Sequence, residues 1–177
     1  MIKNNFIVIS GGPGGGKTSL LEFLSKNGYN YIKESGRTII RERLRKGLSP
    51  RPAPEEFARQ MFQMDYENFI NHADIADILF FDRSFLDSAF LVHQSDQIFF
   101  DKIRHSLITN RFYTKVFMTP PWQEIYTADS ERDQTFDESV EIYEKLSHWY
   151  LTNGYELVTV PRLPVEMRVK MILDEIK

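Results

Sequence analysis

Five glycines in the six positions before a lysine are the feature that most constrains this chain. The stretch FIVISGGPGGGKTSLLEFL covers residues 6 to 24. Glycine loses the most backbone entropy on folding, so this many glycines are a costly choice for an ordinary turn. The spacing of Gly11, Gly16, Lys17 and Thr18 matches G-x-x-x-x-G-K-[ST], in which successive backbone N–H groups wrap a phosphate chain.

The segments on either side of the glycines match what this motif requires. Residues 6–9 form a continuous apolar run, typical of a parallel strand that is buried on both faces. Downstream, Leu20, Phe23 and Leu24 recur at helical spacing, and the pattern stops at Gly28. We therefore predict a strand, a phosphate-binding loop and a helix. This context disfavours the alternative, a glycine-rich turn that matches the motif by chance.

The motif gives each residue of the loop an expected role. The N-terminus of the helix that begins near Lys17 carries unpaired N–H groups and a partial positive charge, which favour an anion. Lys17 is expected to reach the β- and γ-phosphates of a nucleotide, and Thr18 to bind Mg²⁺ through its hydroxyl. Ser19 either takes part in nucleotide binding as well or only stabilises the start of the helix. The predicted nucleotide-binding residues are Gly11, Gly12, Pro13, Gly14, Gly15, Gly16, Lys17, Thr18 and Ser19.

Length and composition narrow the class of protein. The 177 residues suit one domain, so we expect residues 1–177 to fold as a single unit. The absence of cysteine excludes disulfides, zinc thiolate sites and thiol nucleophiles, and the four histidines lack metal-site spacing. A net charge of −3 gives no global attraction to nucleic acid or to an anionic membrane. The N-terminal apolar run of four residues is too short for a membrane span, so a cytoplasmic protein is expected.

Apolar and turn patterns along the rest of the chain predict alternating strands and helices. Further strands are expected at residues 29–33, 77–82, 114–118 and 155–160. Helices are expected at residues 37–46, 54–71, 84–93, 97–109 and 135–153, and from Pro164 onward. Because helices connect parallel strands, this pattern predicts an α/β fold, a three-layer α/β/α sandwich with a five-stranded parallel sheet. Residues 120–136 lack clear periodicity and are the best candidate for a mobile, lid-like loop.

Asp82 is the second candidate site residue. It follows four apolar residues at the expected carboxyl end of a buried strand, the edge of an open α/β sheet where ligands bind. A carboxylate beside the phosphate loop could hold Mg²⁺, directly or through water, or accept a proton from an attacking hydroxyl. The alternative is an aspartate that caps the next helix, and the two roles are compatible.

Several motifs together resemble the small kinase-type P-loop NTPases. The triplet DRS, residues 82–84, is similar to the E/D-R-S element of deoxynucleoside kinases, whose acidic residue acts as base on the substrate hydroxyl. The fuller pattern of GGPGGGKT, ESGR, FFDRSFLDS and SERDQTF is similar to the AAA-labelled ATP-binding family related to the NadR-type ribosylnicotinamide kinase domain. The likeness spans nearly the whole chain. It implies a P-loop NTPase fold of the nucleoside- or nucleotide-kinase type, with ATP and Mg²⁺ as cofactors.

The same resemblance points to residues outside the phosphate loop. Arg132 lies where kinase-type enzymes carry lid arginines that close on the transferring phosphate, unless it is a solvated arginine paired with Asp129 or Asp133. Glu34 and Arg37 follow the second predicted strand and are expected to read a substrate's hydroxyls and its phosphate or carboxylate. Alternatively, Glu34 only caps the next helix. The catalytic candidates are Lys17, Asp82, Arg83 and Arg132, with Thr18 and Asp82 as metal ligands and Glu34 and Arg37 as substrate residues.

The segment 37–51 is basic in an otherwise acidic protein. Together with the preceding Glu34 it holds six basic and two acidic residues, and Arg41 and Arg45 share a helical face with Arg37. One interpretation is a solvated helix face. The others are a phosphorylated acceptor, an anionic lipid headgroup or a protein partner. Nucleic acid is less favoured, because no aromatic platform is woven into the segment.

Two functions are consistent with these features. The leading hypothesis is a phosphotransferase that moves the γ-phosphate of Mg-ATP to a hydroxyl of a small, nucleoside-like acceptor, with Asp82 as base or metal holder. The rival is a nucleotide-dependent switch or regulatory ATPase that signals to a partner by lid movement. The sequence lacks an N/T-K-x-D guanine-reading motif and a D-x-x-G switch, which disfavours a signalling GTPase. Its length disfavours an AAA+ motor with a helical lid domain.

Overall fold

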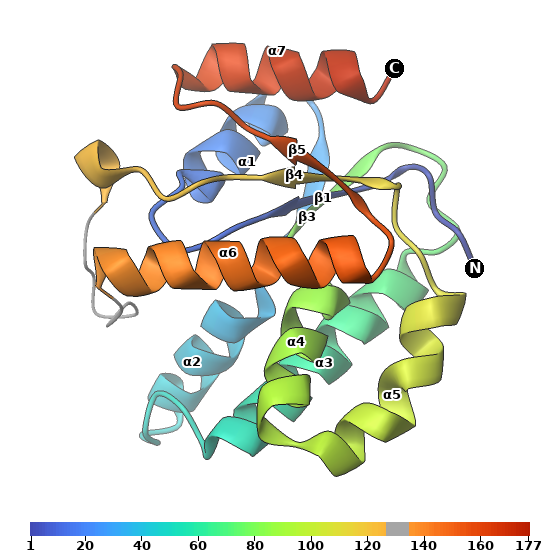
Figure 1. Cartoon of the computed structure of the whole chain (residues 1–177), viewed down its shortest axis with the longest axis vertical. Helices are drawn as coiled ribbons and strands as arrows, with labels where there is room; N and C mark the ends of the chain where they lie inside the picture. Colours follow the sequence, from blue (N-terminus) through green and yellow to red (C-terminus); the bar gives the residue numbers. More distant parts are fainter. Residues whose placement is uncertain (127–134) are drawn as a thin grey trace.

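A parallel β-sheet forms the centre of the molecule (Figure 1). The structure, a computed structural model, describes residues 1–126 and 135–177. Within these residues the sheet has five strands in the order β2-β3-β1-β4-β5, and each neighbouring pair is parallel. The strands are β1 (Phe6–Ser10), β2 (Asn30–Ile32), β3 (Leu79–Asp82), β4 (Lys115–Met118) and β5 (Glu156–Thr159). The predicted five-stranded parallel sheet is confirmed.

Helices cover both faces of the sheet and confirm the three-layer architecture (Figure 1). One face carries α1 (Lys17–Lys26) and α7 (Val165–Glu175). The opposite side carries α2 (Ser35–Arg45), α3 (Pro54–Asn71), α4 (Phe85–Ser95), α5 (Gln97–Thr109) and α6 (Phe136–Thr152), and a short 3₁₀ helix, η1, covers Gln123–Ile125. Among the described residues no helix is both long and apolar enough to cross a membrane.

Strand β1 shows why the sheet needs apolar residues on both faces. Phe6 and Val8 pack into the core beneath α3, α4, α5 and α6, whereas Ile7 and Ile9 pack into the core beneath α1 and α7. Successive side chains of a strand point to opposite faces, so a continuous apolar run fits a doubly covered strand. β1 is therefore the central, fully buried strand from which the phosphate loop emerges.

Helix boundaries follow the capping signals in the sequence. The predicted capping box of α6 is present, because Thr135 accepts from the N–H of Glu138 at 3.2 Å and the Glu138 carboxylate accepts from the N–H of Thr135 at 2.6 Å. Helix α2 starts at Ser35, two residues before the predicted start. Asp96 separates α4 from α5 and caps α5 through the N–H of Phe99 at 3.0 Å.

The strand order brings the carboxyl ends of β1, β2 and β3 to one edge of the sheet. Ile9 pairs with Asp82, so the end of β3 lies directly beside the strand that leads into the phosphate loop. β2 lies on the far side of β3, one strand further from the loop. In open α/β sheets this edge is where ligands bind.

Candidate functional site

The phosphate loop, residues 11–16, needs its glycines for both backbone and packing reasons. Gly11, Gly14 and Gly16 have φ values of 131°, 78° and 73°, a region that residues with a side chain rarely adopt. A Cβ added to Gly15 would lie 2.7 Å from Thr119 Oγ1, so the loop also packs too closely against the end of β4 for a side chain.

The carbonyl groups of the loop are occupied by hydrogen bonds. Each carbonyl oxygen from residue 11 to residue 15 accepts a hydrogen bond from Lys17 or from a residue outside the loop. The pairs are Lys17 Nζ with Gly11 (3.2 Å) and Gly12 (2.8 Å), Ser139 Oγ with Pro13, the Trp122 N–H with Gly14 (3.3 Å), and Arg168 Nη2 with Gly15 (2.8 Å). Three separate parts of the fold therefore hold the loop in shape.

The backbone N–H groups of the loop differ from its carbonyl groups in their hydrogen bonding. In the described part of the chain, those of Gly14, Gly15 and Gly16 donate to no protein acceptor, and Gly16 caps α1 without a side-chain bond. In a planar trans peptide the C=O and N–H point in opposite directions. The carbonyls of residues 13–15 are held by residues outside the loop, so the N–H groups that follow them point away from those partners. Together with the positive end of α1, these groups form an environment that favours an anion such as a phosphate.

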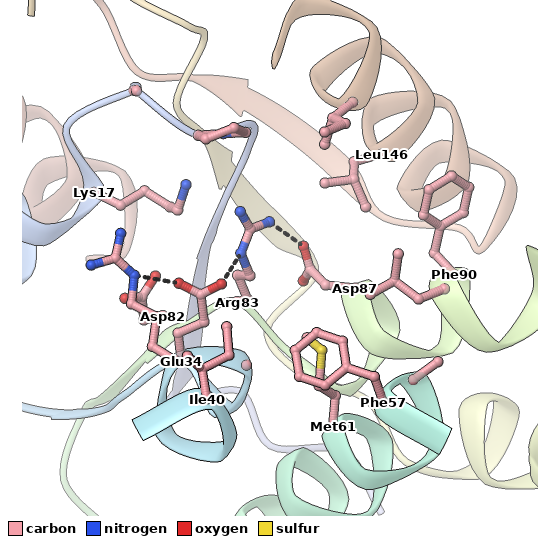
Figure 2. A pocket seen from close by; sticks show the side chains of 18 of the residues that line it. Lys17, Glu34, Ile40, Phe57, Met61, Asp82, Arg83, Asp87, Phe90 and Leu146 are labelled. Carbon is pink, nitrogen blue, oxygen red and sulfur yellow. Dashed lines mark hydrogen bonds and ion pairs between the residues drawn. The ribbon is translucent and has the colours of Figure 1, made fainter. Parts of the chain in front are cut away.

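Two carboxylates lie next to this loop at the ends of neighbouring strands (Figure 2). Asp82 ends β3, and Glu34 lies between β2 and α2. Asp82 Oδ1 is buried and has no hydrogen-bond partner among the residues the structure describes. Thr18, on the first turn of α1, lines the same pocket. Asp82 therefore presents a buried carboxylate oxygen that can bind a metal ion or accept a hydrogen bond.

The neighbouring charges give the two carboxylates different pKa values. Burial, assisted by repulsion from Glu34, raises the pKa of Asp82 to about 6, although Lys17, Arg83 and Arg37 act in the opposite direction. Burial also opposes the charge on Glu34, but Arg83, Lys17 and Arg37 outweigh it and hold the pKa of Glu34 below its usual range. Glu34 is thus ionised at neutral pH, while Asp82 titrates at a pH closer to neutral.

Arg83 lies between Glu34 and a third carboxylate, Asp87 (Figure 2). Its Nε donates to Glu34 Oε1 at 3.1 Å, and its Nη1 lies 3.5 Å from Asp87 Oδ1. Its φ is 69°, an uncommon value for a residue with a side chain, and its N–H donates to Ile9 O at 3.0 Å. Such a conformation persists only where the surroundings determine it, and here it turns the chain immediately after Asp82.

Asp87 is a site residue that the sequence reasoning missed. Its carboxylate accepts from Ser10 Oγ, from the Ser84 N–H at 2.9 Å and hydroxyl at 3.3 Å, and from the Tyr150 hydroxyl, besides Arg83. The spacing of Ser84 and Asp87, which form the capping box of α4, is a signal that could have found it.

Two alternative interpretations of the acidic residues are wrong. Ser84, and not Asp82, occupies the N-cap position of α4. Glu34 does occupy the N-cap position of α2, but its side chain makes no capping hydrogen bond. Its carboxylate contacts Arg83 instead and lies 3.6 Å from Arg37 Nε. Both carboxylates therefore face the site and not a helix end.

The structure separates the members of the basic segment 37–51. Arg37 and Arg51 line the pocket. Arg41 and Arg45 are exposed on α2 and do not line it, and Arg43 donates to Ser49 O at 2.8 Å. Arg132, the expected lid arginine, lies in residues 127–134, outside the described residues.

Arg168 and Ser139 are further residues that sequence reasoning missed. They contact the loop across 153 and 126 positions of sequence, and no local motif marks them. Arg168 is only 3% exposed, its Nε has no partner in the described residues, and burial lowers its pKa. Within residues 1–126 and 135–177 it has no ion-pair partner, so it places a positive charge beside the phosphate loop.

The donor set at the loop fits Mg²⁺ bound together with phosphates. Among the described residues, no group of three or more His, Cys, Asp or Glu side chains is placed to hold a metal ion by itself. Asp82 and the hydroxyl of Thr18 supply two oxygen donors on the rim of the same pocket. Mg²⁺ typically keeps several waters and takes one or two protein oxygens plus phosphate oxygens, so two donors suffice.

The pocket continues beyond the phosphate loop. Its volume is about 750 Å³, and it runs from residues 13–19 past Arg83 to a region between α2, α3, α4 and α6 (Figure 2). Ligand pockets typically measure about 300–1,000 Å³, so there is room for more than the phosphates of a nucleotide. The site can therefore accommodate a second molecule beside a phosphate chain.

These features define a class of protein. A parallel α/β sheet with a glycine-rich loop between β1 and α1, and acidic side chains at the ends of the adjoining strands, is the architecture of a kinase-type P-loop NTPase. Residues 6–168 match a family model described as an AAA domain, and the chain belongs to that family. No curated protein matches the chain.

Solved structures share the fold at low sequence identity. The deoxyadenosine kinase of M. mycoides with the products dCMP and a flexible dCDP bound has a TM-score of 0.66 and 15% identity, over 96% of this chain and 97% of that one. The same kinase with bound dATP gives 0.58 and 17%, over 96% and 98%. The NadR protein in complex with NR gives 0.65 and 14%, over 96% of this chain but 49% of NadR. At these identities the likeness shows the fold.

Proposed function

We propose that residues 1–177 act as one nucleotide-binding unit, which binds Mg-ATP and transfers its γ-phosphate to a hydroxyl of a small, nucleoside-like acceptor. The observation that carries the proposal is the pairing of an anion site with a second compartment. The loop presents N–H groups that have no acceptor in the part of the chain that the structure describes, and the pocket extends from there past two carboxylates. The kinases of known structure that share the fold support the same reaction class.

The strand order suggests a different role for each of the two carboxylates. Asp82 ends the strand beside β1, so it lies on the phosphate side together with Thr18. Glu34 lies one strand further away, on the side of the second compartment. We assign Asp82 and Thr18 to Mg²⁺, which when bound neutralises charge on the β- and γ-phosphate oxygens. We assign Glu34 to the acceptor hydroxyl, whose proton it takes as phosphate transfer proceeds.

Two cations complete the arrangement. Lys17 donates to loop carbonyls in this structure and lines the phosphate end of the pocket, so it would stabilise the charge of bound phosphates. Arg83 is fixed by Glu34 and Asp87, which keeps the Glu34 carboxylate in place beside the second compartment. Arg132 remains a proposed lid residue on the strength of the family resemblance alone.

The test is a product assay with γ-labelled ATP, Mg²⁺ and a panel of nucleosides that includes deoxyadenosine and ribosylnicotinamide. Appearance of a labelled phosphate monoester is expected, and release of inorganic phosphate alone, at a rate that no acceptor changes, would contradict the kinase and favour a regulatory ATPase. Calorimetry on Lys17→Ala tests the loop, since the variant should lose most ATP affinity. Lys26→Ala, at the exposed end of α1, is the matched control.

A further inference from the structure

The part of the pocket beyond Arg83 is an apolar chamber, which we define by Ile40, Phe57, Met61, Phe90 and Leu146. These side chains come from four helices, α2, α3, α4 and α6. Figure 2 shows Phe57, Met61, Phe90 and Leu146 on the side of Arg83 away from Lys17, with Ile40 below Glu34. Ile40, Met61 and Leu146 are buried, and the two phenylalanines are half-buried. The chamber is continuous with the phosphate end of the site.

The buried polar group beside this chamber has no capacity for a ligand. Asp87 receives four separate donors, which are the hydroxyls of Ser10 and Tyr150, the N–H of Ser84 and Nη1 of Arg83 at 3.5 Å. The single hydroxyl proton of Ser84 is shared with Tyr150 at 2.7 Å. A carboxylate offers about four lone-pair sites, so these partners saturate it. Asp87 therefore forms part of the wall and cannot read the edge of a bound ring.

The remaining polar side chains of this half of the pocket lie toward solvent or already have partners. Apart from Glu34 and Arg37, which form an ion pair where the chamber meets the phosphate end, those within the described ranges are Arg51, Gln94, Ser95 and Lys145. Gln94 and Lys145 are exposed, and Ser95 Oγ donates to Leu91 O at 2.8 Å. Arg51 is half-buried and has interactions of its own. The buried wall of the chamber is therefore apolar on the sides formed by α2, α3, α4 and α6.

Such a wall discriminates by hydrogen-bonding capacity. Burying the donors and acceptors of a nucleobase without partners is unfavourable, because those groups lose their water. Burying an apolar ring or alkyl group of similar size is favourable in proportion to its area. The chamber thus selects against a molecule that must be read by hydrogen bonds along its edge and for one that is recognised by packing.

We infer that the acceptor is an alcohol whose hydroxyl faces Glu34 and whose body is an apolar ring or alkyl group held in the apolar chamber. This inference rests on the proposed function. The acceptor oxygen forms a bond to the γ-phosphorus, the bond from that phosphorus to the β,γ-bridging oxygen breaks, and the hydroxyl proton passes to Glu34. The products are ADP and a phosphate monoester of the apolar alcohol.

A matched pair of probes tests the inference. 2′-Deoxyadenosine and its analogue with phenyl in place of adenine carry the same sugar hydroxyls and differ in the hydrogen-bonding edge. With Mg-ATP, we expect kcat/KM for the phenyl compound to be at least tenfold higher. Calorimetry in the presence of a non-hydrolysable ATP analogue should show the same order of affinity. A natural nucleoside that exceeds the phenyl compound tenfold in either measurement overturns the inference.

Variants place the effect in the chamber. Met61→Gln adds an amide to the wall and should weaken binding of the phenyl compound about tenfold, with ATP affinity unchanged. Met61→Leu keeps the wall apolar and should bind the phenyl compound about as tightly as the wild type does. Ile98→Gln, on the exposed face of α5, is the matched control and should change neither value. Unchanged binding of the phenyl compound to a folded Met61→Gln protein would exclude the chamber as its site.

The outcomes separate this inference from the proposed function. Tight binding of the phenyl compound without phosphate transfer would support the chamber and contradict the kinase reaction. Transfer to nucleosides, with no binding of the phenyl compound, would support the kinase reaction and overturn the apolar acceptor.

Discussion

The guanidinium of Arg168 on α7 donates to the carbonyl of Gly15 at 2.8 Å and thereby fixes one peptide of the phosphate loop. Because the peptide is planar and trans, holding this C=O outward directs the next N–H, that of Gly16, toward the interior of the loop. Arg168 is buried, and its Nε has no partner in the described residues. Its charge therefore acts on whatever anion the loop holds, without contacting the pocket itself.

Replacing Arg168 should separate nucleotide binding from fold stability. We expect Arg168→Met to weaken ATP binding about tenfold, or ~1.4 kcal/mol, because a hydrogen bond and a nearby positive charge are lost. The melting temperature should not fall, since the change removes a buried charge that has no counter-ion among the described residues and keeps the apolar stem. Calorimetry and thermal unfolding provide the two values, and Lys170→Met on the exposed face of α7 is the control. Equal ATP affinity in both variants would assign Arg168 a purely structural role.

Asp82 should affect turnover far more than binding. Asp82→Asn is expected to keep ATP affinity within about tenfold, or ~1.4 kcal/mol, and to reduce kcat by roughly 100-fold or more, since a residue that holds Mg²⁺ acts chiefly in the transition state. At neutral pH the variant should not be less stable, because burial already disfavours the charged form of Asp82. Steady-state kinetics and ATP titrations of Asp82→Asn and Glu34→Gln test the assigned roles. Wild-type turnover in Asp82→Asn would remove Asp82 from the site.

Asp65 on α3 predicts a pH dependence of stability. Burial raises the pKa of Asp65 to about 7, with Asp87 and Glu34 adding to the effect, against the opposing hydrogen bond from Ser88 at 2.9 Å. In this range the folded state binds the proton more tightly than the unfolded state. The protonated carboxyl group of Asp65 therefore makes its full contribution to stability below about pH 4. As the pH rises to about 7 this contribution is lost, and the free energy of unfolding falls by up to ~1.4 kcal/mol per pH unit.

Asp65→Asn should remove this slope. Urea unfolding at several pH values between 4 and 7 measures it, and Asp74→Asn, an exposed carboxylate, is the matched control. If the difference in unfolding free energy between wild type and Asp65→Asn stays constant across the window, the carboxyl group does not titrate as described.

Arg132 provides a test of the lid hypothesis, which no contact in the described residues addresses. Arg132→Ala should lower turnover more than it weakens ATP binding, because a closing arginine meets charge that develops during transfer. Arg104→Ala, on the exposed side of α5, serves as the control. Amide exchange of residues 127–134 should slow when an ATP analogue and an acceptor bind together. Exchange that is the same with and without ligands would contradict the lid.

The sequence predicts the elements and the phosphate loop because their signals are local. A glycine-rich motif, a buried apolar run and a capping box such as Thr135 with Glu138 each act over a few residues. The position of Asp82 at the end of β3 is predictable because strand ends are recognisable. The pairing of Glu34 with Arg83 could not be found, since these residues are 49 positions apart and meet only when β2 and β3 pair. Arg168 and Ser139 have no local signal at all.

Helix α6 links the two compartments of the site. Ser139 near its beginning holds the carbonyl of Pro13, and Tyr150 near its end holds Asp87, while Leu146 between them lines the apolar chamber. At 1.5 Å per residue the 17 residues span about 25 Å, so all three contacts belong to one continuous helix. Any tilt of α6 would therefore displace the phosphate loop, the chamber wall and the support of Arg83 in one motion, which couples occupancy of one compartment to the geometry of the other.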